Sequence, residues 1–291
     1  MLGELASIVV PIYLCAALGY GWVRIGRRYD TALITELITF VGAPCLVFSR
    51  LVRLEVDPVE LAHMVGATAA ALTTLGIVGA IALRLAGLPT TSFLAPIMFG
   101  NTGNIGLPVC LFAFGDEGLA LAVCFFATTT IVHFTVGQWV WSGSVSAGLL
   151  ARTPLAYASV IAAAVLAFEL PVPQWLERTT SLLGSFTIPL MQFTLGVSLA
   201  ELHASHIPRS LALSVFRIGL GLAVGLSLAA LLDLTGVARG VFILQCAMPV
   251  AVFNYLMAQR HGRTPGDVAS VVVLSTLVSF GVLPLLLAWL L

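Results

Sequence analysis

Lysine is absent from this chain of 291 residues, and all 13 of its basic residues are arginine. Charge of either sign is scarce, since charged residues make up 9% of the chain, whereas soluble domains carry roughly 25%. The 13 acidic residues balance the arginines, so the composition gives no reason to expect a nucleic-acid partner. Apolar residues reach 59%, which is typical of a chain embedded in a lipid bilayer.

Several motifs that would indicate other chemistries are also missing. The five cysteines are dispersed through apolar segments without a Cys-x-x-Cys pair, which argues against a disulfide framework or a zinc site. No Gly-x-x-x-x-Gly-Lys sequence and no soluble segment of domain length occur, so an ATP-driven motor is excluded. No cofactor or metal is therefore expected. The first apolar run lacks a basic segment before it, and we interpret it as a retained membrane span.

Apolar runs close to the roughly 20 residues that cross a bilayer recur along the chain. They predict an all-α integral membrane protein with ten transmembrane helices, at residues 4–23, 31–50, 58–83, 92–114, 117–141, 153–170, 175–200, 208–232, 237–260 and 267–290. Arginines favour one side of this arrangement, which carries Arg24, Arg27, Arg28, Arg84, Arg152, Arg209, Arg260 and Arg263, over the side with Arg50, Arg53, Arg178 and Arg239. Since the arginine-rich side is expected to be cytoplasmic, both termini should lie outside, in the periplasm of a bacterial inner membrane.

Prolines recur at nearly half the chain length. Four pairs lie 143, 145, 150 and 141 residues apart, namely Pro11 and Pro154, Pro44 and Pro189, Pro58 and Pro208, and Pro108 and Pro249. Five spans per half is an odd number, so the second half would enter the membrane from the opposite side. We therefore predict two inverted five-helix repeats, 1–145 and 146–291, an organisation that underlies alternating access. The alternative is an accidental pairing among 14 prolines.

The fourth and ninth apolar runs are interrupted. The fourth contains Gly-Asn-Thr-Gly-Asn-Ile-Gly-Leu-Pro at 100–108, and the ninth contains Pro249. Broken backbone is tolerated at membrane depth only where it is buried in protein or faces a wet cavity. Two broken helices that cross near the midplane offer N–H groups to an anion and carbonyls to a cation. The alternative interpretation is a pair of proline kinks that only shape a bundle.

Three segments resemble the auxin efflux carrier family, the bacterial relatives of the plant PIN carriers. They are Gly100–Pro108 followed by Gly115, Ala247–Pro249 followed by Ala258–Gly262, and Ala43–Phe48. The resemblance implies a fold like that of the bile acid–sodium symporters, with spans 4 and 9 as broken crossover helices. It also implies a scaffold domain from spans 1, 2, 6 and 7 and a transport domain from spans 3–5 and 8–10. Unlike plant members with a long central loop, this chain has a short connection around 142–152.

The same resemblance implies a secondary transporter of small organic anions, either auxin-like monocarboxylates or malate-like dicarboxylates, with an elevator-type mechanism. Asn101 resembles the asparagine that meets the substrate carboxylate, and backbone groups after Pro249 resemble the other half of the pocket. Two copies are expected to pair through the scaffold domain. The sodium ligands of the symporters are not carried over, because no acidic residue in the ninth run matches them. Sodium-coupled symport is therefore kept only as the alternative function.

The candidate substrate-binding residues lie at the two breaks and at polar positions inside the spans. They are Asn101, Thr102, Gly103, Asn104, Pro108, Gln245, Met248, Pro249, Val250, Asn254, Arg217, His133, Gln192 and Pro44. The polar residues at 101–104 either bind substrate or cap the broken helix, and these roles are compatible. Gln245 and Asn254 either line the cavity or form interhelical hydrogen bonds, and Gln192 is a candidate from the scaffold side.

Two further groups have two open roles each. Arg217 lies about 13 Å along its helix from Pro208, near the midplane, where it either holds a carboxylate or extends toward the cytoplasmic face. His133 either carries a proton or binds an anion, or it has a structural role. No Asp or Glu lies near the centre of a transport-domain span, so we expect ion coupling to be weak or absent, with His133 as the fallback.

Other functional classes fit less well. A membrane protease needs a nucleophile and a base in contact, but Ser142-Gly143-Ser144 lies in a connection without a paired histidine. Asp116 has no second intramembrane aspartate to form a dyad. The chain is therefore predicted not to be an enzyme. A channel would show a continuous polar stripe, whereas polarity here is concentrated at two breaks.

Overall fold

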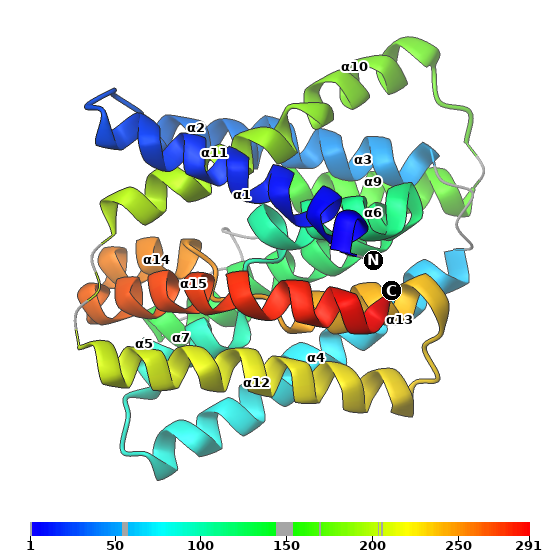
Figure 1. The fold of residues 1–291 in the computed structure, drawn as a ribbon. Helices are drawn as coiled ribbons and strands as arrows, with labels where there is room; N and C mark the ends of the chain where they lie inside the picture. Colours follow the sequence, from blue (N-terminus) through cyan, green and yellow to red (C-terminus); the bar gives the residue numbers. More distant parts are fainter. Residues whose placement is uncertain (1, 54–57, 144–153, 169, 203, 205) are drawn as a thin grey trace.

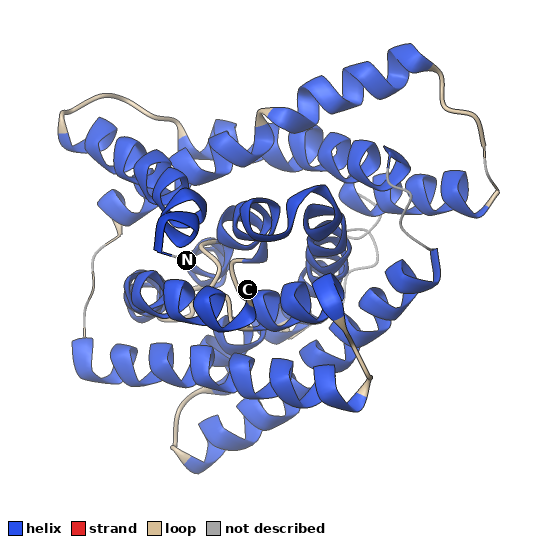
Figure 2. Ribbon diagram, turned by 45° about the vertical axis from the view of Figure 1, so that its right-hand side comes forward, coloured by secondary structure: helices blue, strands red, loops and turns tan. Residues whose placement is uncertain are grey.

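The computed structural model describes residues 2–53, 58–143, 154–168, 170–202, 204 and 206–291. The boundary between the two predicted halves and Arg152 lie outside the described residues. Within the described part the regular elements are helices, and the only extended pairing there is a single bridge between Gly100 and Val250 (Figure 2). The all-α expectation is therefore confirmed for the described chain.

Helices follow one another along the whole chain. The first half contains α1 (Leu2–Arg24), α2 (Thr31–Leu37), η1 (Ile38–Gly42), α3 (Ala43–Arg53), α4 (Pro58–Leu85), α5 (Thr90–Met98), η2 (Thr102–Gly106), α6 (Leu107–Val132), η3 (His133–Gly137) and α7 (Gln138–Ser142), the η elements being π-helical. The second half contains α9 (Pro154–Ala167), α10 (Gln174–Ser185), α11 (Thr187–Glu201), α12 (Ile207–Leu231), α13 (Gly236–Cys246), α14 (Phe253–His261) and α15 (Pro265–Leu290).

Seven continuous helical segments are long and apolar enough to cross a membrane. They are Leu5–Arg24, Thr31–Val52, Val59–Leu85, Thr102–Ser142, Gln174–Glu201, Ile207–Leu231 and Pro265–Leu290, with shorter apolar helices at Pro154–Leu166 and Gly236–Cys246. This pattern is that of an integral membrane protein. The ten-span count and the inverted repeat remain predictions.

The segment Thr102–Ser142 joins what the sequence divides into two spans. It has 41 residues, about twice the length that one bilayer crossing needs. Gly115 interrupts it with φ 67° and ψ −155°, a backbone conformation that glycine adopts at little cost. The break lies between the two predicted spans, so the segment consists of two helices that meet at Gly115.

Helix packing divides the molecule into two groups. In one group α1 packs against α11, and α3 packs against α9 and α10. In the other, α12 packs against α13, α15 and α4, while α4 and α13 also pack against α6. In Figure 1 the labels α1, α2, α3, α10 and α11 lie above α4, α5, α12 and α14. These groups contain the spans predicted for the scaffold and the transport domain, and that assignment remains a prediction.

Close backbone contact between α1 and α11 explains a pair of glycines. A Cβ atom on Gly196 would clash with the Ala16 carbonyl oxygen, and one on Gly19 would clash with the Phe193 carbonyl oxygen. Small residues of this kind let helices approach closely in lipid, where packing rather than the hydrophobic effect holds them together. The first group of helices is therefore built around a tight α1–α11 crossing.

Candidate binding site at the crossing of two broken helices

The two interrupted helices cross, and their interruptions pair with each other. α5 ends at Met98 and α13 ends at Cys246, and an extended segment follows each of them. The Asn101 amide donates to the Pro249 carbonyl at 2.6 Å, and the Ala251 amide donates to the Phe99 carbonyl at 3.2 Å. Gly100 and Val250 form an antiparallel bridge between these two bonds. The pairing satisfies four backbone groups that would otherwise be unpaired at membrane depth.

Glycine at position 100 is required by close approach. A Cβ atom there would lie 2.5 Å from Nη2 of Arg217 and 3.0 Å from the Met248 carbonyl oxygen. Pro249 has no N–H group and therefore leaves no unpaired donor in its own segment. The residues that looked like helix breakers in the sequence thus allow two chain segments to lie side by side.

Asn101 begins the helix that follows the first break. Its side-chain Oδ1 accepts a hydrogen bond from the Asn104 amide at 3.2 Å. Its carbonyl accepts from the amides of Ile105 at 3.3 Å and Gly106 at 3.1 Å. The first amides of a helix, here those of Thr102 and Gly103, have no acceptor within the helix. They therefore carry the partial positive charge of the helix N-terminus.

A cavity of about 530 Å³ lies at this crossing. Both helix starts contribute to its wall, through 101–104 on one side and 251–253 on the other. Each π-helical segment of the described chain contributes as well: η1 through Ile38 and Thr39, η2 through Thr102–Asn104, and η3 through His133 and Phe134. π-Helical turns are rare in proteins, and those that occur often lie at functional sites. No pattern in the sequence indicates them.

Few charged groups line the cavity. Among the described residues in its wall, Glu201 carries a charge and His133 can carry one, and no arginine is present. Threonines, amides and apolar side chains make up most of the rest, including Phe126, Phe134 and Met191. A bound anion would therefore be stabilised by helix N-termini and neutral donors, and its body would contact aromatic surface.

Four buried polar atoms in the cavity wall have no hydrogen-bond partner. They are Oγ1 of Thr31, Nδ2 of Asn101, Oγ1 of Thr129 and Nε2 of His133. Unpaired buried polar groups are rare in native proteins, and each one calls for a ligand or a water molecule. These four atoms are consequently the best-supported contact points for a bound molecule.

His133 is held in place by aromatic rings. Its imidazole stacks on Phe99, with ring centroids 4.0 Å apart and planes inclined by 5°, and meets Phe253 edge-on at 5.2 Å. A Cβ atom on Gly137 would lie 2.6 Å from Cδ2 of the histidine, so glycine leaves room for the ring. Because Phe99 and Phe253 adjoin the two breaks, His133 links η3 to the crossing.

The structure brings some predicted site residues into the cavity wall and places others around it. Asn101, Thr102, Gly103, Asn104 and His133 line the cavity. Other predicted residues do not line the cavity. Met248, Pro249 and Val250 lie in the paired segment, Pro108 lies at the start of α6, and Pro44 lies at the start of α3.

The remaining predicted residues support the crossing from behind. Asn254 Nδ2 donates to the carbonyls of Phe99 at 3.1 Å and Ala251 at 3.2 Å. Gln245 is fully buried beside Gly106, and neither of its amide atoms has a hydrogen-bond partner. Gln192 Nε2, from α11, donates to the Asn104 carbonyl.

Arg217 also lies behind the crossing and does not line the cavity. It is 1% exposed, so it does not extend to the membrane surface. Its Nη1 donates to the Cys246 carbonyl at 3.0 Å, at the end of α13. No carboxylate of the described chain lies within ion-pair distance of it.

Sequence reasoning missed several hydroxyl groups of the cavity wall. Thr129 and Thr130 belong to the run Thr128-Thr129-Thr130 in an otherwise apolar helix, and Thr31, Thr35 and Thr39 recur every four residues. The second pattern places hydroxyls on one helix face and could have been noticed, whereas the consecutive threonines of the first point in different directions around their helix. Which helix face points into the cavity depends on tertiary packing, and no local sequence pattern predicts it.

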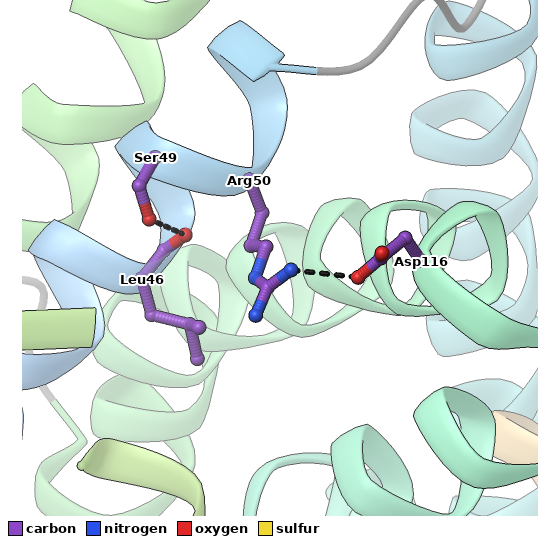
Figure 3. Close-up of polar contacts among 4 residues, drawn as sticks. All are labelled: Leu46, Ser49, Arg50 and Asp116. Carbon is purple, nitrogen blue, oxygen red and sulfur yellow. Dashed lines mark hydrogen bonds and ion pairs between the residues drawn. The ribbon is translucent and has the colours of Figure 1, made fainter. Parts of the chain in front are cut away.

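The opposite end of the α2–α3 segment is joined to α6 by an ion pair. Nη1 of Arg50 lies 2.7 Å from Oδ1 of Asp116, the residue after the Gly115 break (Figure 3). Both side chains are partly or largely exposed, at 27% and 70%. Arg50 is about 30 Å along the helix from Thr31 in the cavity wall. The two helix groups are thus in contact at the end away from the cavity.

Comparisons with known proteins agree with a transporter. The family described as "Membrane transport protein" matches residues 5–144 and 142–287. A protein of Rhizobium meliloti named "Putative malonate transporter" is 24% identical over 302 aligned residues, covering 96% of this chain and 93% of that protein. An "Uncharacterized transporter" of Methanothermobacter thermautotrophicus is 24% identical over 292 residues, covering 95% of each chain. One from Methanocaldococcus jannaschii is 27% identical over 199 residues, 65% of this chain and 64% of that protein.

Proposed function

Because the chain belongs to the membrane transport protein family, which is that of the auxin efflux carriers, we propose that it is a secondary transporter of small organic anions. The family match confirms the resemblance drawn from the sequence. Its substrate is a small molecule and its environment is a lipid bilayer. The family and the names of the relatives indicate a transporter rather than an enzyme.

The observation that carries the anion proposal is the convergence of two helix N-termini on one cavity. The helices that begin at Thr102 and Phe253 both start in its wall. Each start offers unpaired amides and a partial positive charge. The buried Nδ2 of Asn101 adds a donor without a partner. Carboxylates are the anions that such a site suits, because each oxygen can accept several N–H bonds.

Two observations bear on which carboxylates to test, the name of a relative and the residues of the cavity wall. The name of the Rhizobium meliloti relative makes malonate the first compound to test. Aromatic side chains in the wall leave room for a monocarboxylate with a ring, such as an auxin. Both malate-like dicarboxylates and auxin-like monocarboxylates therefore belong to the proposal.

Alternating access is proposed to come from movement of one helix group against the other, as in an elevator. The scaffold would consist of α1–α3 and α9–α11, and the transport domain would carry both broken helices. Three side-chain bonds join the groups in the described chain: the Tyr13 hydroxyl to the Phe280 carbonyl, Gln192 to the Asn104 carbonyl, and Arg50 to Asp116. Such contacts can be exchanged at low cost during a transition.

The described conformation is proposed to face the cytoplasm. Cavity-lining Thr31, Glu201 and Gln259 stand at or near helix ends, and Glu201 and Gln259 are exposed. The arginine-rich connections after α1, α4 and α14 lie at one end of the bundle, at the left of Figure 1. We place that end in the cytoplasm of a bacterial cell, with both termini in the periplasm. Two copies are proposed to associate through the scaffold.

Transport by purified protein in liposomes tests the function. We expect uptake of labelled malonate or indole acetate that is saturable and competed by other carboxylates, with the compound recovered unchanged. Absence of carboxylate uptake, together with no thermal stabilisation by any mono- or dicarboxylate, would refute it. Sodium-coupled symport is the alternative mechanism, and uptake measured with and without sodium separates the two.

A further inference from the structure

Arg217 occupies an unusual position for an arginine. It lies in the middle of α12, is 1% exposed, and points at the end of α13 rather than at the cavity. Two glycines make room for its guanidinium group. A Cβ atom on Gly100 would lie 2.5 Å from Nη2, and one on Gly221 would lie 2.6 Å from Nη1. The guanidinium therefore lies between α13 and the paired segment of the first break.

This guanidinium bonds to a backbone carbonyl rather than to a carboxylate. Nη1 donates to the Cys246 carbonyl at 3.0 Å, and Nε has no partner. The described chain provides no carboxylate within ion-pair distance. A buried, unneutralised positive charge at membrane depth is costly and is retained where it has a function. Since Arg217 does not line the cavity, that function is not direct contact with substrate.

The position of the charge matches the electrostatics of broken helices. The last carbonyls of α5 and α13 have no partner within their helices and carry partial negative charge. In transporters with broken helices, such C-terminal ends commonly coordinate the coupling cation. In this chain the end of α5 is supplied with donors by Ala251 and Asn254, which both donate to the Phe99 carbonyl. The end of α13 is supplied by Arg217.

We propose that Arg217 is a tethered substitute for a coupling cation. It supplies permanent positive charge at the C-terminal end of α13, so that the carrier works without bound sodium. The inference rests on the proposed function for its transport consequence. Its structural part, the occupation of a cation position by a side chain, stands without it. The charge also lies on the far side of the crossing from the cavity, where it favours a bound anion through a low-dielectric interior.

The first test needs no substrate. In purified Arg217→Met, which keeps an unbranched apolar stem and removes the guanidinium group with its charge, the vacated position should accept a free cation. We expect millimolar methylguanidinium or sodium to raise the melting temperature of Arg217→Met and to leave that of the wild type unchanged. Arg209→Met is the matched control, because Arg209 is a partly exposed residue of the same helix paired with Asp267 at 2.6 Å. No cation-dependent stabilisation specific to Arg217→Met would overturn the proposal.

The second test measures malonate binding. Wild-type affinity should be equal in sodium and in choline buffer, whereas Arg217→Met should bind about tenfold or more weakly and recover with methylguanidinium. Strict sodium dependence of the wild type would overturn the role of Arg217 while leaving anion transport intact. Failure of the wild type to bind any carboxylate would instead refute the proposed function. The first test would still show whether the Arg217 side chain occupies a position that a free cation can take.

A third variant covers a folding failure of Arg217→Met. Arg217→Lys keeps a charge but, having a single ammonium group, reaches fewer acceptors than the guanidinium. We expect it to bind malonate without sodium and more weakly than the wild type. If malonate binding by Arg217→Lys depends on sodium, the lysine charge does not replace a cation at this position, and that result would count against the proposal.

Discussion

Replacement of Asn101 by aspartate separates the two roles that the structure gives this residue. Oδ1 of Asn101 caps the helix by accepting from the Asn104 amide at 3.2 Å, and Nδ2 is buried in the cavity wall without a partner. Aspartate retains an oxygen for the cap and turns the free donor into an acceptor. Because a carboxylate at a helix N-terminus is favourable, Asn101→Asp should fold as well as the wild type.

The effect on anion binding follows from the lost donor. A hydrogen bond to a charged group contributes about 1.5–3 kcal/mol, which corresponds to a dissociation constant about 10- to 150-fold higher. The new carboxylate also repels the anion, so the loss should reach or exceed the upper part of this range. Asn101→Ser is the matched control, since serine caps a helix nearly as well as asparagine but adds no charge.

Isothermal titration with malonate, and thermal unfolding of the same samples, measure the two roles separately. We expect Asn101→Ser to lie between the wild type and Asn101→Asp in affinity, with all three similar in stability. Asn101→Ala should lose the cap as well, at about 1 kcal/mol of stability. If Asn101→Asp unfolds like the wild type and binds malonate within about twofold of it, Nδ2 does not contact the anion and the reasoning fails.

Three further variants test other parts of the structure. Gly100→Ala should destabilise the protein by about 1–3 kcal/mol in thermal unfolding, because its Cβ atom has no room at the crossing, while Gly219→Ala, with open space around it, should not. Asp116→Asn should change stability by less than about 1 kcal/mol yet alter the uptake rate, and Arg50→Lys, which keeps the ion pair, should leave the rate unchanged. Equal rates in the two variants would contradict a role of this ion pair in the movement of the helix groups. Burial and two neighbouring arginines lower the pKa of His261 below its ordinary 6.5, so its contribution to stability is complete above that pH and is lost as the pH falls toward the lowered pKa. His261→Gln should therefore show a shallower loss of melting temperature in acid, and an unchanged acid slope would contradict this.

The sequence predicted the features that depend on local composition. Membrane-length apolar helices follow from hydropathy, and the break at 100–108 follows from glycine, asparagine and proline, whose backbone preferences act within a few residues. Asn101 was proposed as a substrate residue from the family resemblance, and the structure places it in the cavity wall, where it caps the helix that follows the break. Recognition of the family added the expectation that the two breaks cross.

Other features depended on how helices rotate and approach one another. The depth of Arg217 followed from the helical rise, but its direction did not, and the structure turns it toward the Cys246 carbonyl instead of the cavity. The bond from Gln192 to Asn104 joins residues 88 apart in sequence. No local pattern encodes such a pairing.

By itself, the sequence determined that this protein lies in a membrane and that two of its helices are broken, because hydropathy and backbone preference are properties of short segments. Only the tertiary structure decided that the breaks pair through Gly100 and Val250, that π-helical turns and Thr129 line the cavity, and that an arginine supplies charge behind it. The physical reason is that helix rotation and contact are fixed by packing among residues far apart in the chain.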